Sequence, residues 1–323
     1  MNYERPNKVS VIDPISPAID RVKLILFSPF DLSRWFVIGF CAWLAYLGGG
    51  GGGGGGGGPR YNFLHKPQEQ KAQIEEGINT AKEYISINLY WFIPVVVIVL
   101  VLIIGIIILI TWLNSRGRFM FLHCVAENKA EVKIPWHKFR NQSKSLFLFR
   151  ILLGIISLII VGVPVLGIVI LIIMMVTGAV PGVFSILGIV ILGLTIFALS
   201  IALFLVKKFT FDFVVPIMFL QTAGCVAGWR EFMTVLSANK LRLALYLLFQ
   251  IVISIVIGAV IGIGFCIGCC LCCVSFLLFI PYIGTVILLP LLVFKRAYSL
   301  YYLKQFGSQF DVFVPEIEAA QPA

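Results

Sequence analysis

The feature that most constrains this chain is the stretch from Ile151 to Val206, which contains no charged side chain. About 20 helical residues cross the apolar core of a bilayer, so this stretch is too long for one crossing and suits two. The segment from Thr177 to Gly182, TGAVPG, lies near its middle, and glycine and proline both disfavour a helix interior. The sequence therefore predicts two membrane-spanning helices that are joined by a tight turn.

The overall composition excludes the main classes of soluble protein. Of the 323 residues, 60% are hydrophobic and only 12% are charged, and the mean hydropathy is +1.01. Soluble domains contain about 25% charged residues and about 45–50% apolar ones. A cytosolic enzyme, a disordered protein and a small disulfide-bonded domain are therefore excluded, and the sequence predicts an all-α integral membrane protein. Residues 1–34 are polar and charged and contain proline, so no signal peptide is expected there.

Apolar runs close to the required length predict six membrane-spanning helices, arranged as three hairpins. The clearest run is Tyr90–Leu113. The first run is short and needs part of the polyglycine segment, Gly48–Gly58, to complete a crossing. A second long apolar stretch, Leu243–Phe294, divides near its middle at a string of cysteines. The predicted spans are residues 35–52, 90–113, 146–174, 183–206, 243–265 and 274–294.

The basic residues predict the orientation, because Lys and Arg are retained on the cytoplasmic side of short loops. With six spans, 21 of the 25 Lys and Arg residues lie on one side of the membrane, together with both chain ends. The opposite side holds only Arg60, Lys66, Lys71 and Lys82. We therefore expect both termini to be cytoplasmic and the protein to lie in the inner cell membrane. Most of the net charge of +10 is then an orientation signal, and no nucleic-acid partner is expected.

Basic residues followed by aromatic ones mark three predicted exits from the membrane into the cytoplasmic headgroup layer. The basic residues, which we expect to contact lipid headgroups, are Arg116, Arg118, Lys207, Lys208, Lys295 and Arg296. After the first two exits the chain repeats the sequence MFL, at 120–122 and 218–220. WHKF at 136–139 then matches WREF at 229–232, and the amphipathic stretch 17–34 is interpreted as a third copy of this element. These similarities predict three units, each an interfacial amphipathic helix that leads into a hairpin.

The largest outer segment is predicted to contain an amphipathic helix over about residues 67–89. Apolar residues recur there at intervals of four, three and four from Ile74 to Ile85, with charged residues between them. We expect this helix to continue into the second span, with Pro94 at most kinking it. The chain then consists of a cytoplasmic N-terminal segment, 1–34, a membrane domain, 35–306, and a cytoplasmic tail, 307–323.

The most concentrated group of potential metal ligands is the sequence CIGCCLCC, which contains Cys266, Cys269, Cys270, Cys272 and Cys273. A CxxC pair on a helix brings two thiolates close enough to share a metal ion or to form a disulfide. A structural zinc site needs a second pair of ligands, however, and all three histidines lie in other loops. Cysteine is also a small apolar residue that suits a tight turn within the membrane. Packing or an incidental disulfide is the main interpretation, and metal binding, redox chemistry and acylation are the alternatives.

Catalytic arrangements of residues are not found in the sequence. It contains no nucleophile beside a base, no paired carboxylates and no metalloprotease motif, so neither an enzyme nor a cofactor is expected. Gly48–Gly58 lacks the GxxxxGK of a phosphate-binding loop and is interpreted as a flexible tether or loop. Asp212 is an acidic residue amid aromatic ones, close to a predicted exit. Lys207 and Lys208 lie within a helical turn of it, so we expect a local ion pair rather than the coupling site of a transporter.

Four segments carry a resemblance to known proteins. They are DPISPAIDR from Asp13, SPFDLSRWFVIGFCAWL from Ser28, SRGRFMFLHCVAENKAEV from Ser115 and DFVVPIMFL from Asp212. Together they resemble a family of uncharacterised prokaryotic multi-pass membrane proteins, distantly similar to the membrane domain attached to some bacterial glycerophosphodiester phosphodiesterases. The resemblance covers about residues 10–300. The catalytic barrel of those enzymes is missing, so the resemblance implies a free-standing membrane module without hydrolase activity.

The sequence thus favours a non-enzymatic inner-membrane protein that acts in envelope or lipid homeostasis. Its expected partners are membrane lipids and either a membrane-protein partner or a second copy of the chain. The alternative is a transporter or channel for an apolar or lipidic solute, which the hairpin repeats and the prolines at 164, 281 and 290 favour. A cysteine redox enzyme at the outer face is a third hypothesis.

Overall fold

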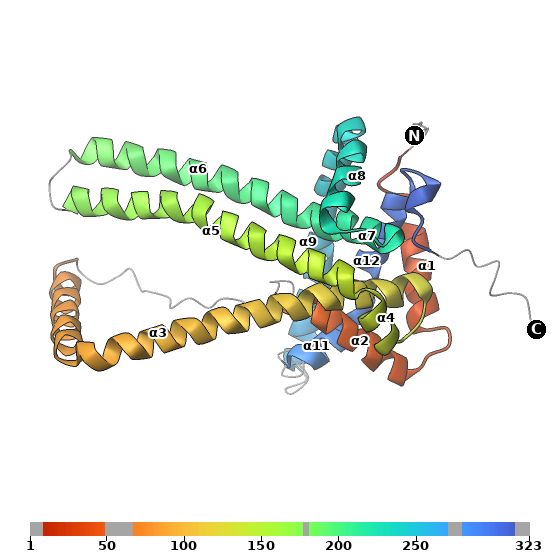
Figure 1. Cartoon of the computed structure of the whole chain (residues 1–323), viewed down its shortest axis with the longest axis horizontal. Coiled ribbons are helices and arrows are strands. Elements are labelled where there is room, and N and C mark those ends of the chain that lie inside the picture. The colour runs from red at the N-terminus through yellow and green to blue at the C-terminus, as the bar shows by residue number, and fades with distance from the viewer. Residues whose placement is uncertain (1–8, 49–66, 177–180, 271–279, 314–323) are drawn as a thin grey trace, which may run out of the picture. The chain divides into compact units, whose positions relative to one another are not determined.

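The computed structural model describes residues 9–48, 67–176, 181–270 and 280–313. These residues form helices and connecting segments, with no strand among them. The chain separates into two units, one comprising Gly48–Ile110 and the other comprising the residues on either side of it. Figure 1 shows the order of the helices along the chain.

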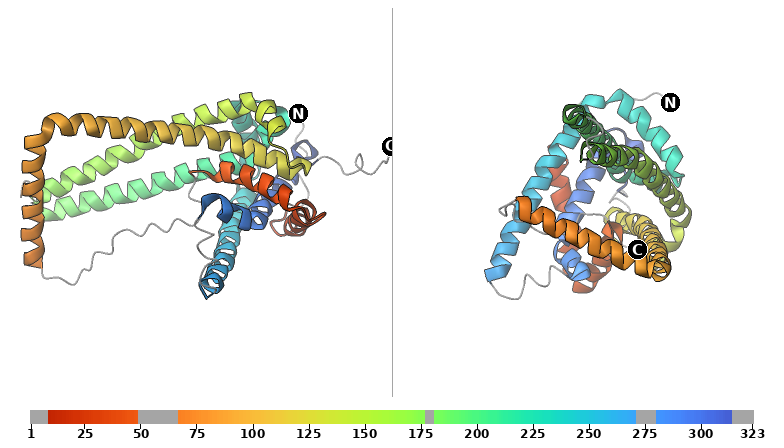
Figure 2. Two further views of the ribbon diagram at one scale, coloured as in Figure 1. Left: turned by 90° about the horizontal axis from the view of Figure 1, so that it is seen from below. Right: turned by 90° about the vertical axis from the view of Figure 1, so that its left-hand side faces the viewer.

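Within the described part of the chain, four helices are long and apolar enough to cross a membrane. Their bounds are α3, Pro67–Glu127; α5, Arg140–Val176; α6, Gly182–Phe209; and α9, Lys240–Cys270. They include the four predicted spans that lie between residues 90 and 265. Little of their most apolar windows is buried in the protein, as suits helices that contact lipid over most of their surface. α5 and α6 lie side by side (Figures 1 and 2).

α3 is a single helix of 61 residues that includes the outer segment predicted to be amphipathic. Pro94 lies inside it, and the helix continues past the proline. The predicted continuity of residues 67–89 with the second span is therefore confirmed.

The first predicted span, residues 35–52, is not confirmed as a crossing. The helix α2, Leu32–Tyr46, has 15 residues, which is fewer than the roughly 20 that a crossing requires. It lies beside the last part of α3. Arg34 near the start of α2 donates hydrogen bonds to Asn128, and Gly117 of α3 lies against the α2 backbone near its other end. The rest of the predicted span lies outside the described residues.

The last predicted span, residues 274–294, is not confirmed either, and part of it lies outside the described residues. The described part is divided between α11, Pro281–Ile287, and α12, Leu289–Lys304. α11 packs against α2, and α12 packs against α2 and against α1, Ile15–Leu26. The described part of this region does not form one helix long enough to cross a membrane, so the six spans and three hairpins stay a prediction.

Three short helices precede longer ones where interfacial helices are predicted. They are α1, α4 (Lys133–Lys138) and α8 (Cys225–Ala238). α1 ends at Leu26, so the predicted element 17–34 is shorter than expected. The apolar face of α1 packs on α12, and that of α8 packs on α5 and on α7, Val215–Gln221. Packing on the protein itself therefore accounts for their amphipathic pattern, and contact of their outer faces with a membrane surface stays a prediction.

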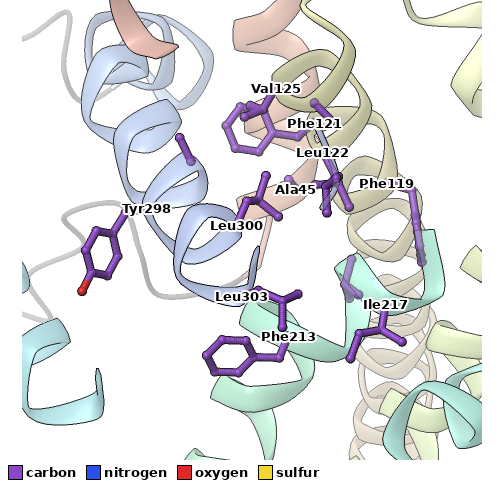
Figure 3. Close-up of a cluster of buried hydrophobic side chains, with 14 of the residues drawn as sticks. Ala45, Phe119, Phe121, Leu122, Val125, Phe213, Ile217, Tyr298, Leu300 and Leu303 are labelled. Carbon is purple, nitrogen blue, oxygen red and sulfur yellow. The ribbon is translucent and has the colours of Figure 1, made fainter. Parts of the chain in front are cut away.

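The core of the larger unit lies where the basic ends of the long helices meet the short ones. Side chains from α2, the last part of α3, α7 and α12 gather in one cluster, in which Phe119 and Phe213 are fully buried (Figure 3). Gly117 permits the close approach of α2 to α3, because a Cβ there would overlap the α2 backbone. The short helix η2, Ser308–Phe310, adds a buried ring to the core. The beginning of the predicted tail, 307–323, therefore packs on the protein.

Candidate functional site

The junction between the long helices and the core is organised around a short π-helical segment. α6 continues through η1, Thr210–Val214, into α7, and η1 has the wider turns of a π-helix. Thr210 Oγ1 donates a hydrogen bond to the carbonyl of Val206 at 2.6 Å. π-Helical turns are rare and occur often at functional sites. The side chains around η1 are therefore candidates for function.

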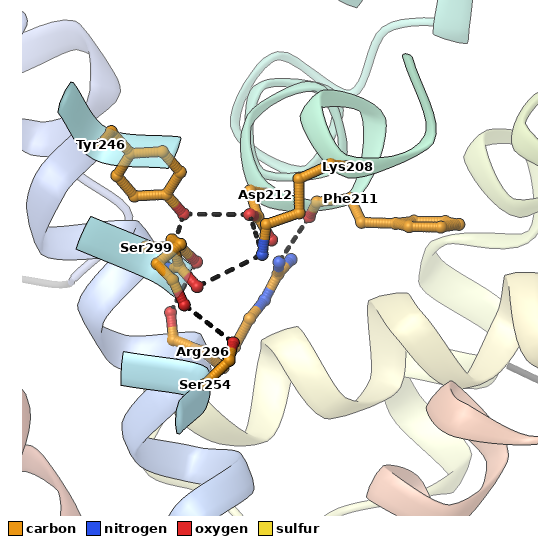
Figure 4. A network of polar contacts seen from close by, with 8 residues as sticks. Lys208, Phe211, Asp212, Tyr246, Ser254, Arg296 and Ser299 are labelled. Carbon is orange, nitrogen blue, oxygen red and sulfur yellow. Dashed lines mark hydrogen bonds and ion pairs between the residues drawn. The ribbon is translucent and has the colours of Figure 1, made fainter. Parts of the chain in front are cut away.

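Three arginines from three different helices meet at Phe211 of η1. The guanidinium carbon of Arg118, from α3, lies 3.1 Å from the centre of the Phe211 ring, and that of Arg150, from α5, lies 5.3 Å from it. Arg296, from α12, donates a hydrogen bond from Nη1 to the Phe211 carbonyl at 2.6 Å (Figure 4). Cation–π stacking and charge-assisted hydrogen bonds both stabilise such an arrangement. Phe211 thus joins the three predicted exits.

Asn114 holds two of these arginines in place. Its Oδ1 accepts hydrogen bonds from Arg118 Nε at 2.8 Å and from Arg150 Nη1 at 2.5 Å. Its Nδ2 donates to the carbonyls of Ala45 and Leu47, both at 2.7 Å, at the end of α2. A carboxamide has two donor hydrogens and an oxygen that accepts two bonds, so this buried side chain is fully used. Asn114 therefore connects α2, α3 and α5.

An ion pair lies next to Phe211 in the sequence. Lys208 Nζ is 2.7 Å from Asp212 Oδ2, which also accepts a hydrogen bond from the Tyr246 hydroxyl at 3.0 Å (Figure 4). The side chain of Gln250 accepts a hydrogen bond from Lys208 at 3.3 Å and donates one to Tyr246 at 3.0 Å. The predicted local ion pair of Asp212 is therefore confirmed, with Lys208 as the partner.

The junction carries more positive than negative charge. Among the described residues, no carboxylate oxygen lies within 4.0 Å of a nitrogen of the three arginines. The carboxylate of Asp212 forms its ion pair with Lys208. Desolvation lowers the pKa of Arg296, and desolvation with repulsion from Lys208 lowers the pKa of Lys295. One carboxylate, Asp212, faces several partly buried positive charges here, and such an excess is costly, so this arrangement favours binding of an anion.

A small cavity lies beside the arginines. It has a volume of about 20 Å³ and is lined by Tyr46, Arg118, Phe211 and Arg296 together with three apolar residues. A volume of this size holds roughly one water molecule, and the lining offers hydroxyl and guanidinium groups as partners. Both arginines of the lining are partly exposed. The cavity therefore gives a small polar atom direct access to them.

The other predicted headgroup residues have different surroundings. Arg116 is buried between the rings of Trp112 and Trp136, 5.0 and 4.4 Å from their centres, and donates to the Trp136 carbonyl at 3.1 Å. Lys207 is exposed and Lys295 is half-buried. Arg116 is thus built into the protein, whereas Lys207 is available to a membrane surface. Headgroup contact stays a prediction for all six basic residues.

The cysteine string lies mostly where the structure gives no side-chain description. Cys266 is exposed and is not in a disulfide. Cys269 and Cys270 end α9, and Cys272 and Cys273 lie outside the described residues. Over the ranges that the structure describes, no three His, Cys, Asp or Glu side chains come together as metal ligands. The alternatives for the string stay open.

Sequence reasoning missed several residues of the junction. Arg150 has a visible signal, because it is the last charged residue before the uncharged stretch. Phe211 is one of the aromatic residues that follow Lys207 and Lys208 at the second predicted exit, but the sequence does not distinguish it from Phe209 and Phe213. Asn114 has no signal, since an isolated asparagine does not stand out. Their importance comes from the partners that the fold brings to them.

The fold and the junction define a helical membrane protein with a basic, aromatic centre at the ends of its long helices. The chain belongs to DUF7544, a family of unknown function whose profile matches residues 9–282. This match covers most of the chain and agrees with the predicted membership of an uncharacterised family. No curated protein and no solved structure matches the chain.

Proposed function

We propose that this chain is a non-enzymatic membrane protein that binds anionic lipids at the cytoplasmic face and acts in envelope or lipid homeostasis. The junction carries the proposal, because its three arginines have no carboxylate partner in the described structure and lie at the ends of apolar helices. Anionic headgroups are the counter-ions that a membrane offers at such a boundary. The predicted distant similarity to the membrane domain of glycerophosphodiester phosphodiesterases would agree with a role in lipid metabolism.

Two exposed basic residues lie close to the junction in the sequence. Lys144 on α5 is exposed and lies six residues before Arg150. Lys207 on α6 is also exposed and lies four residues before Phe211. Each Lys or Arg close to an anionic surface contributes about 1 kcal/mol of attraction, which salt screens. The proposal therefore requires a preference for anionic lipids that weakens as ionic strength rises.

Reconstitution of the purified full chain tests the proposal. The protein is placed in nanodiscs of phosphatidylcholine alone or of phosphatidylcholine mixed with phosphatidylglycerol, and thermal unfolding is followed at low and high salt. A ligand that binds the folded state raises the unfolding midpoint, here by roughly 4 °C with the anionic lipid at low salt. High salt should reduce the difference. Equal midpoints in both lipids at low salt would contradict the proposal.

A membrane-protein partner or a second copy of the chain is part of the same proposal. The long helices expose apolar side chains along their most hydrophobic parts, and a second protein surface can cover them as well as lipid does. Chemical cross-linking in native membranes tests this part. A product that contains a second chain supports it, and recovery of the uncross-linked chain alone counts against it.

A transporter or channel for an apolar or lipidic solute is the alternative. The observation that favours it is the partly buried Lys208–Asp212 pair at the end of the uncharged stretch, since paired ionisable groups in membrane proteins often belong to transport pathways. Proteoliposomes that carry a fluorescent lipid in the inner leaflet provide the test. Lipid transfer faster than in protein-free liposomes, and lost in Asp212→Asn, supports transport. No acceleration argues against it.

A further inference from the structure

The three arginines at Phe211 have no carboxylate within 4.0 Å in the described structure, but other side chains and a carbonyl hold them in place. Asn114 fixes Arg118 and Arg150, and the Phe211 carbonyl fixes Arg296. The nearest acidic partner of the segment, Asp212, is already bound by a lysine and a tyrosine. Preorganised positive groups without a carboxylate are the arrangement that proteins use to bind phosphate.

The arginines also retain donors for a ligand. Within the described structure Arg118 makes its hydrogen bond through Nε, and Arg296 makes its bond through Nη1. A guanidinium has five N–H donors, so terminal nitrogens of both side chains remain available beside the cavity. Two guanidinium groups that line the same cavity can bind several oxygens of a single phosphate.

The size of the cavity limits what enters it. Its volume of about 20 Å³ suits one oxygen atom and excludes an entire phosphate group. A phosphate would therefore lie at the cavity mouth, with one unesterified oxygen inside, next to Tyr46. A monoester has more unesterified oxygens than a diester and carries up to two negative charges near neutral pH. A monoester therefore offers three cations more negative charge and more hydrogen-bond acceptors than a diester does.

The position of the site indicates a lipid as the source of the phosphate. Arg150 is the last charged residue before the uncharged stretch of α5 and α6, which places it at the boundary where headgroups lie. We propose that Arg118 and Arg296 bind the phosphate monoester headgroup of an acidic lipid, with one phosphoryl oxygen in the cavity beside Tyr46 and with Arg150 adding positive charge nearby. This inference rests on the proposed function and assigns its lipid contact to one internal site.

Native mass spectrometry of the full chain, released from phosphatidylcholine nanodiscs that contain phosphatidic acid, tests the site. The wild-type chain should retain one phosphatidic acid. Arg118→Gln should weaken retention by roughly tenfold, because a charge-assisted fork is lost. Arg230→Gln, which removes an exposed guanidinium from α8, is the matched control and should change retention by less than about twofold. Equal retention by wild type and Arg118→Gln would overturn the site.

If Arg118→Gln fails to fold, Arg118→Lys provides a second test, because it keeps the positive charge and removes only the planar guanidinium group. It should fold and still lose most of the retention, because an ammonium group cannot replace a planar fork. Full retention by a folded Arg118→Lys chain would overturn the site. Competition with soluble glycerol 3-phosphate identifies the source of the phosphate. If it competes for the site as well as phosphatidic acid does, the phosphate site is supported and its assignment to a lipid is overturned.

The outcomes also separate this inference from the proposed function. A wild-type chain that prefers anionic lipids but keeps that preference in the Arg118 variants contradicts the internal site alone. A wild-type chain without any preference for anionic lipids contradicts the proposed function.

Discussion

The carbonyl oxygen of Phe211 accepts a hydrogen bond from Arg296 at 2.6 Å, although the two residues are 85 positions apart. Through its backbone Phe211 connects η1 with α12, and through its ring it contacts arginines of α3 and α5. The junction thus links the three regions in which the sequence predicts exits from the membrane. Substitutions within it should therefore affect the stability of the whole unit.

Asn114→Ala should destabilise the protein strongly. It removes all four hydrogen bonds of the side chain and leaves two carbonyls of α2 and two guanidiniums without that partner. The expected decrease in the free energy of unfolding is about 3 kcal/mol. Denaturant unfolding in detergent micelles measures it. Asn141→Ala, at an exposed position of α5, is the control and should change it by less than about 0.5 kcal/mol. Equal effects of the two substitutions would contradict the role of Asn114.

Gly117→Ala should also destabilise the protein, through the helix contact. The added methyl group would overlap the backbone of α2 at Leu44 and Ala45, so the two helices must separate. Overpacking of this kind costs about 1–3 kcal/mol. Gly154→Ala is the matched control, because a Cβ at Gly154 meets no atom within 4 Å. A thermal midpoint lowered in the first variant and nearly unchanged in the second is expected, and the reverse order would refute the close packing.

Asp212→Asn should destabilise the protein more than removal of both charges does. The single substitution leaves Lys208, only 16% exposed, without its ion partner, and breaking such a pair costs about 3 kcal/mol. The double variant Lys208→Met with Asp212→Asn removes the uncompensated charge and should recover part of the loss. Unfolding midpoints of the two single variants and the double variant form the cycle. Strictly additive effects would show that the two side chains do not interact.

Cys225 should resist alkylation in the folded protein. It is 1% exposed, and burial raises the pKa of its thiol to about 12. At pH 8 roughly one thiol in 10,000 would then be ionised, and only the thiolate reacts. Peptide mapping after iodoacetamide treatment should find Cys225 unmodified in the folded chain and modified after unfolding in denaturant. Similar labelling of Cys225 before and after unfolding would contradict this.

The raised pKa of the Cys225 thiol also makes the stability of the protein depend on pH. An unfolded thiol ionises near pH 8.5, whereas Cys225 stays protonated until about pH 12 in the folded chain. The stabilising contribution of this protonated thiol is therefore complete below pH 8.5 and is lost as pH rises toward 12. Cys225→Ala should make the unfolding midpoint less sensitive to pH between 8.5 and 11, which thermal unfolding across that range measures.

Much of the helical architecture could be predicted because it depends on local sequence. Runs of apolar residues located the four long helices, and periodicity in residues 67–89 predicted a helix that passes Pro94. The ion pair between Lys208 and Asp212 followed from their spacing of four residues. Each of these features is determined within one helix, where spacing along the chain fixes the distance between side chains.

The rest depends on contacts between helices, which spacing does not reveal. α2 is apolar enough to be counted as a span, yet it packs beside α3. The role of Gly117 becomes visible only when the backbone of α2 is seen next to it. The three arginines belong to three helices, so their meeting at Phe211 is a property of the tertiary fold. The amphipathic pattern of α1 predicted a membrane-surface helix, but an apolar face also fits a protein core, and here it packs on α12.

The cytoplasmic location of the junction is the claim on which both lipid proposals depend. Its most direct test is labelling of single cysteines with a membrane-impermeant reagent in intact cells, after replacement of the native cysteines. Probes are placed near Lys71, Lys133 and Lys240 and at the C-terminus. The account predicts that only the probe near Lys71 reacts. Reaction of the probes near Lys133 and Lys240 instead would place the junction on the outer side and contradict the account.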